Sequence, residues 1–170
     1  MSTIYTIGYE GTDIDRFIAT LKAVDVLVLA DVRAVALSRK KGFSKLALRT
    51  RLEAEGIDYI HFINLGDPKP GRDAARAGQL DKFRQIYGLH LAGTEAQLAF
   101  GELAKVVKFK PTCLLCFERD PNACHRSIVA KKLALLGMEI LNLYGDLPRR
   151  YDNFAQTRSR RYLGEGTAAA

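Results

Sequence analysis

The stretch that decides the fold is VLVLADVR, residues 26–33. Its first five residues form a continuous apolar run, which is typical of a parallel strand covered on both faces. The run stops at Asp31, and polar residues directly after a buried strand mark the edge of an α/β sheet where ligands bind. This stretch therefore predicts a buried parallel strand with chemistry at its carboxyl end.

Working outward, four further segments have the composition of strands: residues 4–7, 57–63, 113–117 and 139–143. Segments with helical spacing alternate with them, at residues 12–21, between Ser44 and Gly56, over 73–107 and over 125–136. This alternation requires right-handed βαβ units. We expect a single Rossmann-like, doubly wound α/β domain over residues 1–146, with a mainly parallel sheet and helices on both faces. Residues 147–170 are expected to form a basic C-terminal tail, disordered at its end.

Local signals also predict where helices begin and break. Thr12 with Asp15 three residues later resembles a capping box at the start of the first helix. Ser44 is the expected N-cap of the second helix. The long helical segment 73–107 is expected to break once, near Gly88 or Gly93.

The totals exclude some classes of protein and favour others. No apolar run approaches the roughly 18 residues of a membrane span, and the N-terminus lacks the basic flank and apolar core of a signal peptide. We therefore expect a cytoplasmic protein without membrane contact. A formal net charge of +7 among 170 residues favours anionic partners, either a small molecule or nucleic acid. Nothing in the sequence indicates the oligomeric state.

The end of the strand at residues 26–30 carries the first candidate anion site. Asp31 and Arg33 are two residues apart, so in extended backbone they point the same way. They can form an ion pair that leaves guanidinium donors for an anion, or a salt bridge that only fixes the loop. Ser38 and Arg39 open a basic loop that lacks the glycine spacing of a P-loop. The competing interpretation is a mobile, solvated run of charge; we keep Ser38 and Arg39 as anion-binding candidates.

The sharpest local signal is Cys124-His125-Arg126 at the start of a helix. A helix N-terminus beside cations lowers the pKa of a thiol, so Cys124 is a candidate nucleophile. His125 is a candidate acid or base, and Arg126 can bind a carboxylate or phosphate. The competing interpretation is a small buried cysteine and a structural histidine. Glu118, directly after an apolar strand, is a candidate general acid or base, or else an ion-pair partner of an arginine.

Cys113 and Cys116 form a C-x-x-C pair, which suggests zinc or redox chemistry. The residues between them are strand-like, so the two side chains should face opposite sides of the sheet. Cys113 is then a core residue, whereas Cys116 shares a face with Glu118 and joins the candidate anion site. We expect no metal and no cofactor.

These motifs together resemble a known family. They are TIGYEG at residues 6–11, DVR at 31–33, Ser38-Arg39 with Phe43, GIDY at 56–59, Leu65-Gly66, and LCFE at 115–118 with CHR at 124–126. In this order, over residues 3 to about 146, they resemble the prokaryotic family called domain of unknown function 488. The resemblance implies a Rossmann-like domain and a polar cluster made of Asp31, Arg33, Ser38, Arg39, Cys116, Glu118, Cys124, His125 and Arg126. It implies no reaction. Many relatives have Gly-His-Ser where this chain has Gly8-Tyr9-Glu10.

Three hypotheses for the function follow. The first is an enzyme, a hydrolase or group-transfer catalyst, acting on a phosphate-bearing substrate such as a nucleotide or nucleic acid. The second is a nucleotide- or nucleic-acid-binding module without turnover. The third is a redox or zinc protein, which requires the cysteines to converge in space. Fold alone does not choose among them, because doubly wound sheets carry many unrelated functions.

Overall fold

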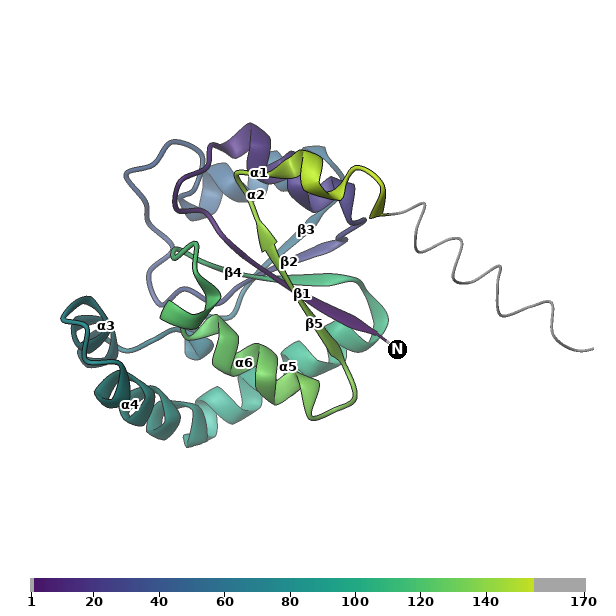
Figure 1. Ribbon diagram of the computed structural model, residues 1–170. Helices are drawn as coiled ribbons and strands as arrows, with labels where there is room; N and C mark the ends of the chain where they lie inside the picture. The colour runs from purple at the N-terminus through teal and green to yellow at the C-terminus, as the bar shows by residue number, and fades with distance from the viewer. Residues whose placement is uncertain (1, 155–170) are drawn as a thin grey trace, which may run out of the picture.

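A five-stranded, all-parallel sheet forms the centre of the structure, a computed structural model that describes residues 2–154 (Figure 1). The strands are β1 (Thr3–Gly8), β2 (Val28–Asp31), β3 (Asp58–His61), β4 (Thr112–Cys116) and β5 (Glu139–Tyr144). Their order is β3-β2-β4-β1-β5. β4 follows β1 and β2 in the chain but lies between them in the sheet, so the strand order changes direction there. Doubly wound sheets form their binding crevice at such a switch point. The predicted α/β fold is confirmed.

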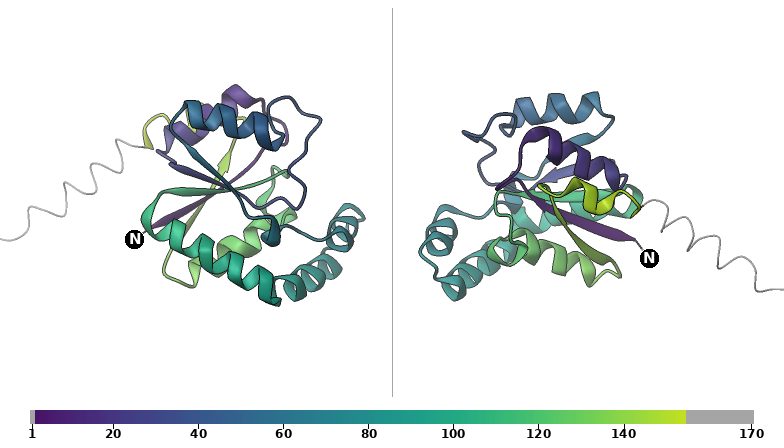
Figure 2. Two further views of the ribbon diagram at one scale, coloured as in Figure 1. Left: turned by 180° about the vertical axis from the view of Figure 1, so that it is seen from behind. Right: turned by 45° about the horizontal axis from the view of Figure 1, so that its top comes forward.

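Helices cover both faces of the sheet. They are α1 (Ile14–Ala23), α2 (Lys45–Ala54), α3 (Lys69–Arg76), α4 (Leu80–Ala92), α5 (Thr94–Phe109) and α6 (Arg126–Ala134). Figure 1 shows α1 and α2 on one face and α5 and α6 on the other, and the rear view in Figure 2 agrees. The hairpin of α3 and α4 extends the second layer beyond the sheet. Three short 3₁₀ turns, Ile63–Leu65, Pro121–Ala123 and Pro148–Tyr151, complete the connections.

Alternation along the strands supplies two separate cores. Tyr5 and Ile7 pack with α1 and α2, whereas Ile4 packs with α4, α5 and α6. Likewise Cys113 lies in the first core and its neighbour Leu114 in the second. Each fully buried aliphatic or aromatic side chain contributes roughly 1.5–3 kcal/mol, so both helical layers are held by burial. The alternation also sends Cys113 and Cys116 to opposite faces, as the strand-like spacing predicts.

Helix boundaries differ from the expected ones in two places. The N-cap of α1 is Asp13, whose carboxylate accepts the backbone N–H of Arg16 at 2.9 Å, and not Thr12. The Thr12 hydroxyl instead makes a tertiary hydrogen bond, donating to the carbonyl of Gly145 at 2.7 Å. The segment expected as two helical pieces forms three. Besides the expected break at Gly93, a further one occurs at Gly78, which has a φ of 73°.

The chain beyond Asp146 continues to pack on the domain as far as Phe154. Tyr151 is buried in the first core, and its hydroxyl accepts the backbone N–H of Tyr144 at 2.9 Å. The ring of Phe154 lies edge-on to Tyr5. The basic tail expected from residue 147 thus begins as a packed turn. Its end, expected to be disordered, lies outside the described residues. Within residues 2–154, no helix has the length and apolar character needed to cross a membrane.

Two glycines allow loops to approach the strand ends closely. A Cβ at Gly8, the last residue of β1, would lie 1.8 Å from the carbonyl oxygen of Glu118. A Cβ at Gly66 would lie 2.3 Å from the Cα of Ala34. Both contacts are with backbone, which cannot rotate away. The segment after β4 therefore occupies the space that a side chain at position 8 would need, and the loop after β2 occupies the space that a side chain at position 66 would need.

We expect Gly8→Ala to lower the free energy of unfolding by about 3 kcal/mol or more, because the methyl group collides with the backbone at Glu118. Chemical denaturation measures this change. The matched control is Gly88→Ala, within α4, where an added Cβ meets no atom within 4 Å. The control should be neutral or stabilising by about 0.5–1 kcal/mol. Equal stability of Gly8→Ala and the natural chain would contradict the assigned contact.

Candidate functional site

Loops at the carboxyl edge of the sheet enclose a cavity of about 570 Å³. Its lining comes from the segments after β1, β2, β3 and β4, from the start of α6, and from the α3–α4 hairpin. The polar or ionisable side chains in the lining are Tyr9, Arg33, Asp67, Arg72, Arg76, Cys116, Glu118, Cys124 and His125. The apolar wall includes Leu37, Phe83 and Phe117. Of the sequence candidates, the cavity thus brings together Arg33, Cys116, Glu118, Cys124 and His125.

Asp31 and Arg33, of which Arg33 lines the cavity, form a buried two-pronged ion pair. Arg33 donates through Nε to Oδ1 of Asp31 at 2.9 Å and through Nη2 to Oδ2 at 2.7 Å. Asp31 also accepts the backbone N–H of Arg33 and the hydroxyl of Tyr59. Burial alone would lower the pKa of Arg33, but the hydrogen bonds and charge of Asp31 outweigh it and raise that pKa. This geometry is compatible with both interpretations of the pair, as a salt bridge that fixes the loop and as an anion site.

The loop after β2 is held by backbone contacts and leaves Arg39 outside the lining. The third guanidinium nitrogen of Arg33, Nη1, donates to the carbonyl of Phe43 at 2.8 Å. Ser38 and Ser44 bind each other across the loop: the N–H of Ser38 donates to Oγ of Ser44, which donates back to the carbonyl of Ser38. Ser44 is the N-cap of α2, as expected, but its side chain serves this loop and not the helix. Arg39 itself is exposed.

The thiols of Cys116 and Cys124 meet the imidazole of His125. Nδ1 of His125 lies 3.7 Å from Sγ of Cys116 and 3.8 Å from Sγ of Cys124. Nε2 lies 2.5 Å from the carbonyl oxygen of Val32. Because a carbonyl only accepts hydrogen bonds, Nε2 carries a proton and Nδ1 is the atom that faces the sulfurs. The ring is therefore fixed in the orientation that presents Nδ1 to both cysteines.

The surroundings separate the two cysteines chemically. Burial would raise the pKa of Cys116, but hydrogen bonds from Cys124, His125 and Glu118, with the charge of His125, hold that pKa well below the usual range. Burial, together with the hydrogen bond to Cys116 and its charge, raises the pKa of Cys124 well above its usual range. The environment thus favours a thiolate at Cys116 and a neutral thiol at Cys124.

Glu118 and His125 complete a proton-sharing group around Cys116. Oε2 of Glu118 lies 2.9 Å from Sγ of Cys116. Burial, and then the charge of Cys116, raise the pKa of Glu118 to about 7. Burial alone would lower the pKa of His125, but the charge of Cys116 and the bonds to Cys116 and Val32 raise it to about 9. Near neutral pH the group therefore favours a thiolate beside an imidazolium and a carboxyl that can give up its proton.

Arg126 lies below the cavity and not in its lining. It is fully buried, and its guanidinium donates to the hydroxyl of Thr6 and to the carbonyl oxygens of Glu118 and Arg119. Its backbone N–H points at Sγ of Cys124, at 3.4 Å. Arg126 thus positions the segment that carries Glu118 and adds a fixed positive charge near the thiols.

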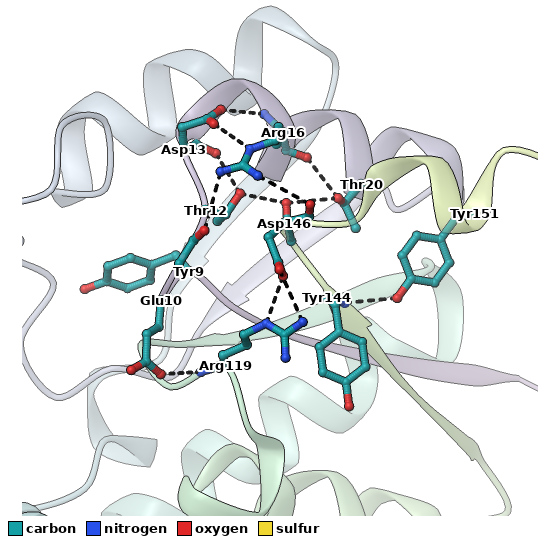
Figure 3. Close-up of polar contacts among 12 residues, drawn as sticks. Tyr9, Glu10, Thr12, Asp13, Arg16, Thr20, Arg119, Tyr144, Asp146 and Tyr151 are labelled. Atoms are coloured by element: carbon teal, nitrogen blue, oxygen red, sulfur yellow. Dashed lines mark hydrogen bonds and ion pairs between the residues drawn. The ribbon is translucent and has the colours of Figure 1, made fainter.

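A second polar network holds the other flank of the same segment (Figure 3). The backbone N–H of Arg119 donates to Oε2 of Glu10 at 2.9 Å, and its guanidinium donates to both carboxylate oxygens of Asp146, at 3.0 and 3.2 Å. The guanidinium also stacks over the ring of Tyr144. Residues after β1, β4 and β5 are thereby joined. The backbone N–H of Glu10 also donates to the carbonyl of Phe117 at 2.8 Å, so both neighbours of Glu118 are anchored.

Sequence reasoning did not name Asp67, Arg72 or Arg76 as site residues. Asp67 follows the third predicted strand, so the rule that places polar residues after strands at the binding edge applies to it as it does to Asp31. It is buried, and within residues 2–154 its Oδ1 has no hydrogen-bond partner. Arg72 and Arg76 lie four residues apart on α3, on one helix face. No motif marks them, because α3 begins four residues before the helical segment that the spacing predicts.

We expect Asp31→Asn to lower the free energy of unfolding by about 3–5 kcal/mol, because it leaves Arg33 buried with its charge unpaired. Chemical denaturation measures the change. Asp58→Asn is the matched control: it removes an ion pair to Lys110 whose side chains are both about half exposed or more. That loss should be below about 1 kcal/mol. Similar losses of unfolding free energy in both variants would contradict the larger effect expected for the buried pair.

Asp67 should make stability depend on pH. Burial raises its pKa from 3.8 to about 6, despite opposing charges of His125 and Arg72. Between these values the folded chain keeps a proton that the unfolded chain has lost, so the contribution of Asp67 to stability falls as pH rises towards 6. The free energy of unfolding of Asp67→Asn, relative to that of the natural chain, should be about 2 kcal/mol higher at pH 7 than at pH 4. Denaturation of both proteins at each pH checks this, and a difference that stays constant with pH would refute it.

Comparison with known proteins gives one match. No curated protein and no solved structure matches the chain. The family model described as "Domain of unknown function DUF488" matches residues 13–133, a segment that runs from the N-cap of α1 almost to the end of α6. This segment includes the ion pair of Asp31 and Arg33 and the whole thiol cluster. The resemblance drawn from the motifs is confirmed: the chain belongs to the DUF488 family.

Proposed function

We propose that this protein is an enzyme that uses the thiolate of Cys116 as a nucleophile towards a phosphate-bearing substrate bound in the cavity. The observation that carries the proposal is the position of Sγ of Cys116, which lies in the cavity wall 3.7 Å from Nδ1 of His125 and 2.9 Å from Oε2 of Glu118. A nucleophile beside a base and an acid is the arrangement that covalent catalysis requires. We assign the nucleophile to Cys116 in place of Cys124.

The proposed reaction has two steps. The Cys116 thiolate attacks the electrophilic centre of the substrate, the bond to the leaving oxygen breaks, and Glu118 transfers its proton to that oxygen. The ionised Glu118 then takes a proton from water, which adds to the same centre, and the thiolate leaves as the bond to sulfur breaks. Cys124 donates a hydrogen bond to the sulfur, and the His125 imidazolium stabilises its negative charge. An acceptor other than water would make the same steps a group transfer.

The cavity composition supports an anionic substrate with a flat apolar part. Arg72 and Arg76 lie in the wall opposite the strand ends and can bind phosphate oxygens. Phe83 and Phe117 offer apolar surface to a base or another ring. A nucleotide combines both features. The positive net charge also favours anions. All three guanidinium nitrogens of Arg33 are occupied by Asp31 and Phe43. Within the described part of the chain, Arg72 uses only Nη1, on the carbonyl of Asp67, and Arg76 forms only an exposed ion pair with Asp73, so we assign anion binding first to these two residues.

Thiols that must remain reduced fit the cytoplasm, where disulfides are rare. All three cysteines are free in the structure. We therefore also propose a cytoplasmic location.

In the native protein, iodoacetamide at pH 7 should modify Cys116 at least about ten times faster than Cys113 or Cys124, because the thiolate is the reactive form. Mass spectrometry of peptides locates the modification. Inorganic phosphate and adenosine and guanosine mono- and triphosphates are then tested as protecting ligands. At least one of the nucleotides should slow the modification of Cys116.

The arginine assignment has its own matched pair of variants. Arg76→Gln should raise the nucleotide concentration needed to protect Cys116 by about tenfold, which corresponds to the loss of one charged hydrogen bond. Arg84→Gln changes an exposed arginine on α4 that pairs with Asp81 outside the cavity lining and should leave protection unchanged. An unreactive Cys116 would refute the nucleophile. Nucleotide binding with an unreactive Cys116 would instead favour a binding module without turnover.

A further inference from the structure

We propose that Cys116, Cys124 and His125 form a binding site for a thiophilic divalent cation, with Zn²⁺ as the probe. Sγ of each cysteine and the imidazole nitrogen lie within 4.8 Å of one another. The two nitrogen–sulfur distances are 3.7 and 3.8 Å. Tetrahedral zinc, with bonds of about 2.3 Å to sulfur and 2.0–2.1 Å to nitrogen, separates these ligands by about 3.6 Å. The three atoms are therefore already near the spacing that the ion imposes.

The orientation of His125 supports metal binding independently of these distances. Ligating histidines almost always donate their second ring N–H to a carbonyl or carboxylate, which fixes the ring and its tautomer. In this structure Nε2 of His125 makes that bond with the carbonyl of Val32 at 2.5 Å. A bound cation displaces the Nδ1 proton of the imidazolium to solvent, and the lone pair of Nδ1 then faces both sulfurs. The carbonyl of Val32 therefore supplies the hydrogen-bond acceptor that a zinc-ligating histidine needs.

A fourth coordination position would open towards the cavity. The three ligating residues all belong to its lining, so water can reach this position. Three protein ligands and one open position are characteristic of catalytic and exchangeable zinc sites, not of closed structural ones. Asp67 in the same lining is 97% buried, since its exposed fraction is 3%, and its Oδ1 has no partner among the described residues. This Oδ1 lies against Gly71 on α3, and the charge of Asp67 acts on His125, so the carboxylate adds negative charge near the bound cation.

The donor set selects the class of cation. Two thiolates and an imidazole favour zinc and other thiophilic ions, whereas Mg²⁺ and Ca²⁺ prefer oxygen. Binding also releases the thiol proton of Cys124 to solvent, and the two resulting thiolates balance the charge of a divalent ion at a largely buried position. This site is not the C-x-x-C pair of the sequence: Cys113 lies on the opposite face of β4, and Cys124 takes its place.

This inference does not depend on the proposed function, although the two share a sulfur atom. A cation bound to Cys116 holds the electron pair that the nucleophile uses. The metal-bound and metal-free proteins are therefore two states, of which only the second reacts at Cys116. Zinc would act on the enzyme as an inhibitor.

The experiment uses the full chain, reduced and freed of metal by a chelator. Zn²⁺ titrated by calorimetry should bind at one site per chain, and Co²⁺ should give the absorption of a tetrahedral thiolate complex. Cys116→Ser and Cys124→Ser should each weaken Zn²⁺ binding by more than the roughly 10–100-fold that loss of an outer partner causes. Cys113→Ser, which changes the thiol on the opposite face, should bind Zn²⁺ as the natural chain does.

A second measurement needs no variant and so does not depend on whether the variants fold. In the natural chain, one equivalent of Zn²⁺ should protect Cys116 and Cys124 from iodoacetamide and leave the slow reaction of Cys113 unchanged. Absence of stoichiometric Zn²⁺ binding, or Co²⁺ spectra without thiolate absorption, would overturn the metal site. The proposed function is judged separately by the reaction of Cys116 in metal-free protein, so either proposal can fail alone.

Discussion

The site depends on the ion pair and hydrogen bonds of the fully buried Asp31 carboxylate. It accepts hydrogen bonds from the guanidinium and backbone of Arg33 and from Tyr59 on the neighbouring strand. A buried ion pair contributes little net stability compared with apolar packing, but it strongly favours one geometry, because any other leaves a charge unpaired. That geometry fixes Val32 between the paired residues. The carbonyl of Val32 then orients His125, so that its ring faces both sulfurs.

Much of this arrangement could be predicted from the sequence. Buried strands appear as apolar runs, and in a parallel sheet all their carboxyl ends lie along one edge. The order of strands and polar residues along the chain is therefore enough to predict that Asp31, Cys116 and Glu118 lie near one another. The alternation of side chains also separates Cys113 from Cys116. These inferences succeed because the alternation of side chains along a strand and the rules for connecting parallel strands can be applied to the sequence alone.

What could not be predicted depends on distances between separate segments. The cysteine motif at 124–126 drew attention to a helix start, but the preference for a thiolate at Cys116 arises from contacts with Glu118 and His125 across the loop. Arg126 carries the same charge wherever it lies, and only the fold shows that backbone carbonyls occupy its donors. Arg72 and Arg76 are ordinary surface residues in sequence. They reach the cavity because the break at Gly78 folds α3 back against α4.

The cavity is built from two parts of the chain that differ in what constrains them. The reactive groups stand on loops at the sheet edge, where glycine contacts and buried charges leave little freedom for substitution. Much of the remaining wall comes from the α3–α4 hairpin, part of the connection between β3 and β4, which supplies Arg72, Arg76 and Phe83. The hairpin surface can therefore change without altering the contacts of Cys116, Glu118 and His125. Under the proposed function, substitutions in this one segment would alter which molecule the cavity accepts and leave the reacting groups in place.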